Sequence, residues 1–246
     1  MRWPTRRAEP YSEDRGLPRA RPMTLSLLAA DPPSGELGMV IASSSPAVAA
    51  RCAHIRPTIG VAATQNVTDP RLGPALLDAL TGGQDPEHAI ATVRSNFEHI
   101  EYRQLAVVDR SGRATGWSGR RALGVHGVRT AAACVAAGNL LADEHVLDEM
   151  IFGFQESGEL TLAERLLAGL HAAAEAGGEA GPLRSAGLLV SADVPWPVVD
   201  LRIDDHDAPV TALTTLWEHY APLRDDYVTR ALNPSAAPTF GVPGDE

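Results

Sequence analysis

Two apolar runs near the start of the chain predict a β-hairpin. They cover residues 24–30 and 36–42, and a short segment rich in Pro, Ser and Gly separates them. Such a link between two strand-length apolar runs is typical of antiparallel neighbours. If the turn centres on Pro33 and Ser34, the numbers of paired residues sum to about 67. This register predicts that Thr24 faces Ser43.

The remaining segments come in groups of strands and pairs of helices. After an ambiguous stretch over 46–54, strands are predicted at 58–65, 104–109, 114–118, 123–128, 130–137, 185–191 and 198–203. Helices are predicted at 72–80, 86–97, 143–156 and 161–175, and from 209 to about 220 or beyond. Thr161 with Glu164 three residues later forms a capping box.

This order of elements indicates the fold class. Strands grouped as meanders, with helices in pairs, favour antiparallel sheets covered by helical layers rather than parallel βαβ units. We therefore predict an α/β (α+β) fold, a four-layer αββα sandwich. One domain is expected over residues 23–231, after an extension over 1–22 and before a flexible C-terminal tail over 232–246.

Composition excludes several mechanisms and partners. All 21 basic side chains of the 246-residue chain are Arg, so Schiff-base chemistry and a P-loop lysine are ruled out. The formal net charge of −10 disfavours nucleic acid as a partner. The two cysteines are far apart, which signals neither a zinc site nor a disulfide and fits a cytoplasmic protein. No apolar run reaches the ~18 residues of a membrane span.

The first 22 residues differ from the rest of the chain. They hold six Arg against three acids, a net charge of +3. Since the whole chain has a net charge of −10, the residues after position 22 carry −13. No hydrophobic stretch follows Arg6 and Arg7, so the segment fails as a secretion signal. We interpret it as upstream sequence and expect translation to start at Met23. Autocatalytic removal and cleavage by another protease are the alternatives.

Met23 and Thr24 together suggest a nucleophile. A threonine hydroxyl needs a base to take its proton, and a free α-amine on the same residue can be that base. The reference pKa of an α-amine, about 7.7–8.0, leaves a useful neutral fraction at cytoplasmic pH. Because threonine is small, a start at Met23 also favours removal of the initiator methionine. In the competing interpretation, Thr24 is only a β-branched residue that begins a strand.

Four segments in order carry a resemblance to a known family. They are the run from Met23 to Leu80, then GNLLADEHVLDEMIFGF (138–154), RSAGLLV (184–190) and VVDLRIDDHDAPVTAL (198–213). Together they resemble the bacterial family called domain of unknown function 1028, which is assigned to the N-terminal nucleophile (Ntn) hydrolase superfamily. The resemblance implies an αββα Ntn fold and, by superfamily analogy, hydrolysis of an amide-type C–N bond through an acyl-enzyme on Thr24. We expect a small-molecule amide substrate and no cofactor, and a homodimer is the default expectation.

Supporting roles follow as hypotheses. Ser43 and Ser44 would orient the amine or relay its proton, and Thr64 and Gln65 would bind substrate, although all four fit ordinary strand-end hydrogen bonding equally well. Asn139 is the candidate donor to a tetrahedral oxyanion, or else a turn residue that satisfies its own backbone.

The remaining candidates are charged. Arg184 would hold a substrate carboxylate through its bidentate fork, or else pair with the acidic body of the protein. The run of residues 204–207, DDHD, suggests a metal hydrolase, but consecutive strand residues point to opposite faces, so we predict no metal site and expect the run to cap the last helix. A catalytically silent binding or scaffolding protein on the same fold is the second functional hypothesis.

Overall fold

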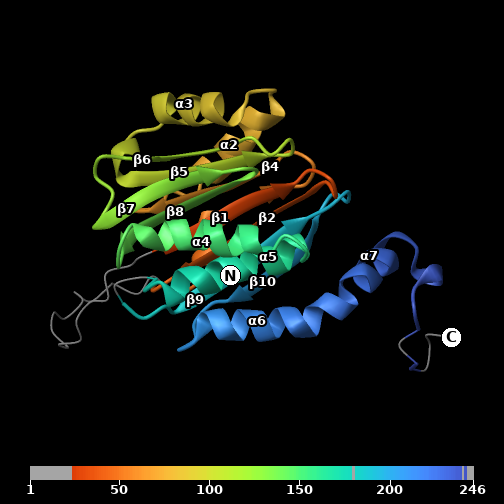
Figure 1. Ribbon diagram of the computed structural model, residues 1–246. Helices are drawn as coiled ribbons and strands as arrows, with labels where there is room; N and C mark the ends of the chain where they lie inside the picture. Colours follow the sequence, from red (N-terminus) through yellow and green to blue (C-terminus); the bar gives the residue numbers. More distant parts are fainter. Residues whose placement is uncertain (1–23, 179–180, 240, 243–246) are drawn as a thin grey trace, which may run out of the picture.

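Two antiparallel sheets, packed face to face and covered by helices on their outer sides, make up a computed structural model of the chain (Figure 1). It describes residues 24–178, 181–239 and 241–242, so the predicted extension over 1–22 lies outside the described residues. The larger sheet has the order β10-β9-β2-β1-β8-β7 and the smaller one β3-β4-β5-β6. The predicted αββα sandwich of antiparallel sheets is confirmed.

The element bounds are as follows. The larger sheet contains β1 (Thr24–Asp31), β2 (Glu36–Ser43), β7 (Val125–Ala131), β8 (Cys134–Leu141), β9 (Ser185–Ser191) and β10 (Pro197–Ile203). The smaller sheet contains β3 (Ala53–Arg56), β4 (Gly60–Asn66), β5 (Arg103–Asp109) and β6 (Ala114–Ser118). The helices are α1 (Val48–Cys52), α2 (Leu72–Thr81), α3 (Pro86–Asn96), α4 (His145–Glu156), α5 (Leu162–Glu175), α6 (Pro209–Tyr220) and α7 (Arg224–Leu232). Short 3₁₀ turns cover Ile100–Tyr102, Ala221–Leu223 and Pro234–Ala236.

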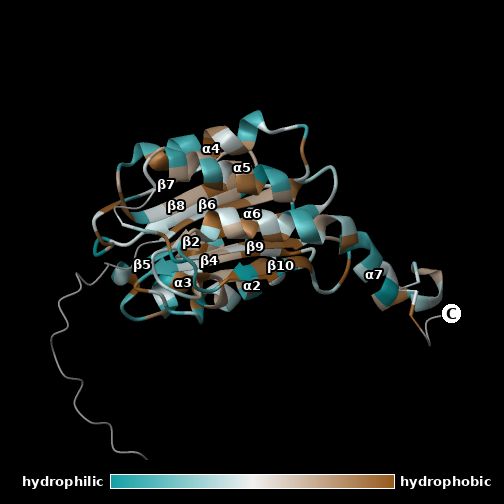
Figure 2. Cartoon of the chain, turned by 90° about the horizontal axis from the view of Figure 1, so that it is seen from below, coloured by the Kyte–Doolittle hydropathy of each residue, from teal (hydrophilic) through white to brown (hydrophobic). Residues whose placement is uncertain are grey.

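Alternation along the strands produces three apolar layers. On β1, Leu25 and Leu27 point outward and pack under α4, α5 and α6, whereas Leu28 and Ala30 point inward, toward the second sheet. The outer face of the second sheet packs against α2 and α3. In Figure 2 the strands are mostly white to brown, and the teal, hydrophilic colour lies mainly on the outer helices and loops.

The hairpin has the predicted register. β1 and β2 pair from Thr24 with Ser43 through Asp31 with Glu36. β1 also pairs with β8 on its other side, which places Thr24 opposite Asn139. Because β1 is an interior strand of the larger sheet, its first residue lies between two neighbours rather than at an edge.

Three segments differ from the prediction. The ambiguous stretch forms α1 and the edge strand β3, whose four residues are too few to show a period. β7 and β8 begin later than predicted because a turn with Ala133 at φ 58° divides the apolar run over 130–137. After α6, the chain continues into the separate helix α7, which projects from the body in Figure 1.

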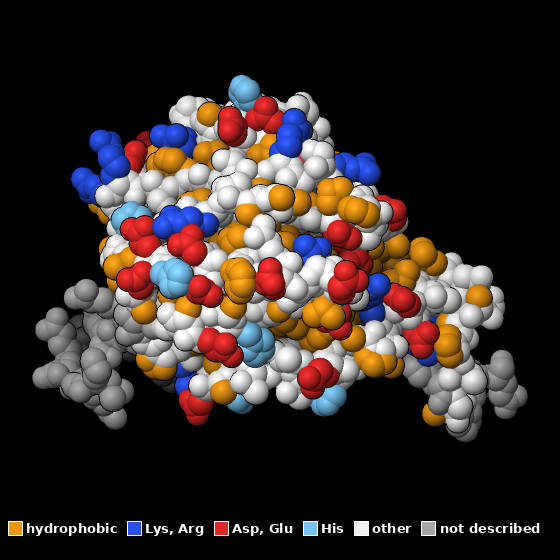
Figure 3. Space-filling model, in the orientation of Figure 1, with side chains coloured by type: hydrophobic (Ala, Val, Ile, Leu, Met, Phe, Trp, Pro, Cys, Tyr) orange, Lys and Arg blue, Asp and Glu red, His pale blue; other side chains and the backbone are white. Residues whose placement is uncertain are grey.

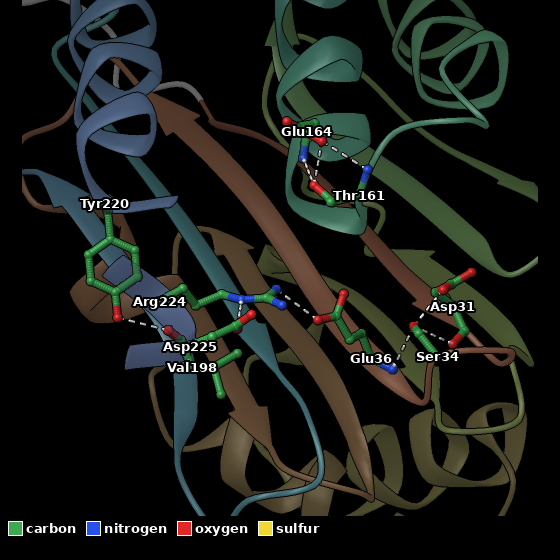
Figure 4. A network of polar contacts seen from close by, with 9 residues as sticks. All are labelled: Asp31, Ser34, Glu36, Thr161, Glu164, Val198, Tyr220, Arg224 and Asp225. Atoms are coloured by element: carbon green, nitrogen blue, oxygen red, sulfur yellow. Dashed lines mark hydrogen bonds and ion pairs between the residues drawn. The ribbon is translucent and has the colours of Figure 1, made fainter. Parts of the chain in front are cut away.

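Polar contacts fasten this C-terminal part at the hairpin-turn end of the sandwich, opposite Thr24 (Figure 4). Arg224 donates to Glu36 at 2.9 Å, and the Tyr220 hydroxyl donates to the carbonyl of Val198 at 2.9 Å. Figure 4 also shows the predicted capping box of Thr161 and Glu164, which is confirmed at the start of α5.

The surface reflects the composition. Figure 3 shows acidic side chains scattered over the face formed by α4 and α5, with arginines and histidines between them. Within the described residues, no helix combines the length and the apolar character that crossing a membrane requires.

Candidate active site around Thr24

Thr24 lies at the start of β1, and its side chain belongs to the face that looks toward the second sheet. Ser26, two residues on and therefore on the same face, reaches across to Gln65 of β4. The Thr24 hydroxyl donates to Ser43 Oγ at 3.3 Å. Ser43 Oγ also accepts from the backbone N–H of Ser45 at 3.0 Å. The predicted neighbours Thr24 and Ser43 are thus joined by their side chains.

A chain of side-chain hydrogen bonds, which we call the circuit, runs from Ser26 through Gln65, Gln104 and Asn139 to the Thr24 carbonyl, so both of its ends lie on β1. Ser26 Oγ donates to Gln65 Oε1 at 2.8 Å, and Gln65 Nε2 donates to Gln104 Oε1 at 2.7 Å. Asn139 Nδ2 approaches the same Gln104 oxygen at 3.3 Å and the Thr24 carbonyl at 3.4 Å. All five residues are buried. The circuit joins both sheets at the end of the sandwich where Thr24 lies.

Gln104 is the centre of this circuit, and sequence reasoning missed it. Its Nε2, which carries two N–H groups, lies within hydrogen-bond distance of three acceptors: the Gly138 carbonyl at 2.9 Å, the Gly127 carbonyl at 3.0 Å and Ser118 Oγ at 2.7 Å. The signal was present in the strand pattern, because Gln104 shares its face with buried Ala106 and Val108. A polar residue on the buried face of a strand indicates an internal partner.

The segment after β2 is fastened by a second residue that sequence reasoning missed. Ser185 Oγ donates to the Ser45 carbonyl at 2.6 Å and accepts from the N–H of Val48 at 3.1 Å. The candidate Ser44 lies inside this fastened segment, is buried, and comes one residue after the register partner of Thr24.

Thr64 and Gln65 are separated by the pleat of β4. Gln65 faces the interior circuit, but Thr64 faces the helix layer, where its hydroxyl donates to the Asp69 carbonyl at 3.4 Å and its own carbonyl accepts from Thr68 at 2.6 Å. Consecutive strand residues point to opposite faces, so of the two residues predicted to bind substrate, Gln65 lies on the interior side of β4 and Thr64 on its helix side.

Asn139 lies beside Thr24, as its register partner on β8, but its side chain does not offer the hydrogen-bond donor that was expected. Its amide N–H groups point to the Thr24 carbonyl and to Gln104 Oε1, so they are not available to an oxyanion. Its Oδ1 is buried and has no hydrogen-bond partner among the described residues. Asn139 therefore offers the site an acceptor. It also lies within β8, not in a turn.

Arg184 adjoins the site through its backbone, whose N–H donates to the Ser43 carbonyl at 2.8 Å. Its guanidinium is held by Asp205, at 2.7 Å, and by Asp207. These hydrogen bonds raise the pKa of Arg184 above its ordinary value. Of the two predicted roles, the structure shows pairing with acidic residues.

The residues around 204–207 thus have structural partners. Besides the two aspartates on Arg184, His206 Nδ1 accepts from the N–H of Ala208 at the start of α6 at 2.9 Å. Over the described ranges, no group of three or more His, Cys, Asp or Glu side chains is arranged to hold a metal ion.

The interior around Thr24 is uncharged. Among the described residues the fully buried polar side chains include a single ionisable carboxyl, Asp109. It lies at the opposite end of β5 and binds Ser111 and Arg113. Burial raises the pKa of the Cys134 thiol to about 11 and also raises that of Cys52, so neither thiol is ionised at neutral pH. The Thr24 hydroxyl contacts the Ser43 hydroxyl, and the other polar groups of the circuit are amides and the Ser26 hydroxyl.

Fold and site together define an α/β sandwich protein with a buried threonine and a neutral amide circuit at one end of its interior. The family described as "Family of unknown function (DUF1028)" matches residues 24–213, and the chain belongs to it. The crystal structure of protein SPO2555 from Silicibacter pomeroyi, with the same family description, is similar at 36% identity and a TM-score of 0.78, covering 83% of this chain and 89% of that one. Anbu (ancestral beta-subunit) from Yersinia bercovieri has 9% identity and a TM-score of 0.38, over 81% and 94%. No curated protein matches the chain.

Proposed function

We propose that this protein is an Ntn-type amidohydrolase that cleaves the C–N bond of a small amide through an acyl-enzyme on Thr24. The observation that carries the proposal is the neutral interior around the Thr24 hydroxyl. A threonine hydroxyl reacts only when a base takes its proton, and the side chains of the circuit and Ser43 are hydroxyls and amides. The α-amine of Thr24 itself, once Thr24 is the first residue, supplies the missing base. The family match, which begins at Thr24, supports this assignment.

The reaction follows from these groups. The α-amine takes the proton of Thr24 Oγ1 while this oxygen attacks the carbonyl carbon of the substrate. When the tetrahedral intermediate collapses, the C–N bond breaks and the leaving nitrogen takes a proton from the α-ammonium. Water, deprotonated by the same amine, then attacks the Thr24 ester, and the α-ammonium returns a proton to Thr24 Oγ1 as the acid leaves. Ser43, which accepts from the Thr24 hydroxyl, holds Oγ1 in position before the attack.

The test uses a β-lactone with a small neutral side chain. Attack by Thr24 Oγ1 opens the lactone ring, so the protein gains the whole mass of the probe as one ester. A chain started at Met23, with removal of the methionine verified by intact mass, is compared with its Thr24→Ala variant and with the full 246-residue chain. We expect one ester, mapped to Thr24, in the first and none in the Thr24→Ala variant.

The controls separate the alternatives. Thr64→Val removes a buried threonine hydroxyl on the helix side of β4 and is expected to leave labelling unchanged. The full chain is expected to react only to the extent that its mass shows loss of residues before Thr24. Folded protein that begins at Thr24 and stays unlabelled, or that is labelled equally after Thr24→Ala, contradicts the proposal and favours a silent binding protein.

A further inference from the structure

The orientation of the amides in the circuit is determined by two backbone carbonyls. Gln104 lies against the carbonyls of Gly127 and Gly138, at 3.0 and 2.9 Å. A backbone carbonyl only accepts, so the Gln104 end that faces these carbonyls is its NH₂ group. Its oxygen Oε1 is then the end that faces Gln65 and Asn139.

The orientation of Gln104 in turn determines that of Asn139. The group of Asn139 that approaches Gln104 Oε1 and the Thr24 carbonyl has two acceptors before it, at 3.3 and 3.4 Å, and must be its NH₂. Its oxygen Oδ1 is left on the other side of the amide. The orientation thus follows from donor and acceptor chemistry and not from a choice between two similar atoms.

The Asn139 oxygen is therefore an acceptor that awaits a donor. It is completely buried and has no hydrogen-bond partner among the described residues. A buried polar atom left without a partner costs about 1–3 kcal/mol, and nearly all such atoms in proteins are paired. Gln65, Gln104 and Ser26 in the same circuit all have partners, so Asn139 Oδ1 is the exception in it.

Thr24 is the neighbour that can supply the donor. Its carbonyl is 3.4 Å from Asn139 Nδ2, and the two residues are register partners on β1 and β8. In an extended strand the nitrogen and the carbonyl oxygen of one residue leave the chain on the same side, so the Thr24 nitrogen also lies on the β8 side. A peptide nitrogen carries one N–H in a fixed direction, whereas a free α-amine rotates and carries two or three.

We propose that Asn139 is a positioning residue that accepts a hydrogen bond from the free α-amine of Thr24 at Oδ1. The inference rests on the proposed function, because it requires that Thr24 be the first residue. With one N–H held by Asn139, the lone pair of the amine is directed toward Thr24 Oγ1, which Ser43 holds from the β2 side. This assigns Asn139 to the base of the reaction and removes it from the oxyanion.

Few charges act on this amine. The side chains that β2, β4 and β5 contribute to the network around Thr24 are those of Ser43, Gln65 and Gln104, which are neutral. The charged or titratable side chains near this end of the sandwich include Arg184 with Asp205 and Asp207, which bind one another, and His126 on β7, which contacts the Gly124 carbonyl. On the helix side of the second sheet they include Arg103, which donates to the Val67 carbonyl, Asp69 with Arg71, and Tyr102 with Arg121. A substitution at position 139 therefore changes the charge or the hydrogen bonding next to the amine, while these charged groups stay as they are.

The experiment measures the rate of β-lactone labelling of Thr24 against pH, in protein that begins at Thr24. Asn139→Leu removes the acceptor that stabilises the ammonium form of the amine, so the midpoint of the pH profile is expected to fall by about 0.5 pH unit or more. The plateau rate is expected to fall at least about tenfold, because the amine is no longer held in position. Asn139→Asp keeps an acceptor and adds negative charge when it ionises, so its midpoint is expected to rise by about one unit. Thr64→Val, on the opposite face of β4 from the circuit, is expected to leave the midpoint unchanged.

The outcomes distinguish this inference from the proposed function. A merely structural role of Asn139 lowers the fraction of folded protein but does not move the midpoint, so unchanged midpoints in both variants, with normal labelling of the parent, overturn the inference alone. A crystal structure of the parent beginning at Thr24 provides a test without variants. We expect the terminal nitrogen within about 3.2 Å of Asn139 Oδ1, and a separation above about 4 Å overturns the inference. Absence of labelling in the folded parent contradicts the proposed function itself.

Discussion

Replacement of Gln104 by leucine tests the amide circuit as a source of stability. Leucine has a similar volume but neither donates nor accepts, so Gln65 Nε2, Asn139 Nδ2 and the Gly138 carbonyl each lose a partner inside the protein. Ser118 and Gly127 are half-buried, so these two partners can turn to water. With about 1–3 kcal/mol for each buried group left unpaired, we expect the free energy of unfolding to fall by about 2–5 kcal/mol.

The assay is urea denaturation at pH 7 and one fixed protein concentration, since association would change the apparent stability. The matched control is the same substitution at an exposed helix position, Gln155→Leu in α4, which is expected to change the free energy of unfolding by less than about 0.5 kcal/mol. A double variant, Gln65→Leu with Gln104→Leu, removes both ends of one hydrogen bond. Its cost is expected to be smaller than the sum of the single costs by about 1 kcal/mol or more.

Two results would refute this reasoning. If Gln104→Leu costs no more than Gln155→Leu, the circuit does not stabilise the fold. If the costs of Gln65→Leu and Gln104→Leu simply add, the two amides do not depend on one another, although their side chains lie 2.7 Å apart. In either case the orientation assigned to Asn139 would lose its physical basis.

Three further predictions concern the packing outside the site. In Gly73→Ala, the new Cβ would lie 2.0 Å from Cδ2 of His54, so we expect the free energy of unfolding to fall by about 1–3 kcal/mol, which a lower melting temperature would show. In the control Gly158→Ala the new Cβ has no atom closer than 3.6 Å, so the melting temperature is expected to change little. Burial lowers the pKa of His54, so below pH 6.5 the unfolded chain binds a proton at this residue more readily than the folded protein does. The free energy of unfolding is therefore expected to fall from pH 7 to pH 5, and to fall by less in His54→Gln. Urea denaturation at the two pH values measures the difference. Arg224→Gln leaves Glu36, whose side chain is 13% exposed, without its ion pair. Since burial already raises the pKa of Glu36, we expect a loss of about 1–3 kcal/mol at pH 7 and a smaller one near pH 4.5, where protonation removes the unpaired charge.

Local signals predicted much of this protein. The turn around Pro33 and Ser34 gave the register that pairs Thr24 with Ser43, because a short turn leaves an antiparallel hairpin few alternatives. Helix ends with their own chemistry were also predictable. Pro86 begins α3 as its first residue, and Thr161 begins α5 with its capping box. Each of these features depends on residues that are close together along the chain.

Other features gave only weak local signals. The edge strand β3 has four residues and depends on β4 for its hydrogen bonds, so no period within it could reveal it. The turn between β7 and β8 requires Ala133 in the left-handed region, a conformation for which alanine gives no warning. Gln104 was visible as a polar residue on an apolar face, but the pattern could not say which residues it would meet.

The sequence by itself determined the fold class, the hairpin at the start of the domain and the threonine that begins it, because period, turn and cap are properties of short segments. Only the tertiary structure decided what surrounds that threonine. Asn139 lies 115 residues from Thr24 along the chain, and it becomes a neighbour because β8 pairs with the free side of β1. Gln65 and Gln104 reach the site from a different sheet. Strand order and sheet packing result from the burial of apolar surface over the whole domain, so no single segment of sequence contains the information that places an acceptor beside Thr24.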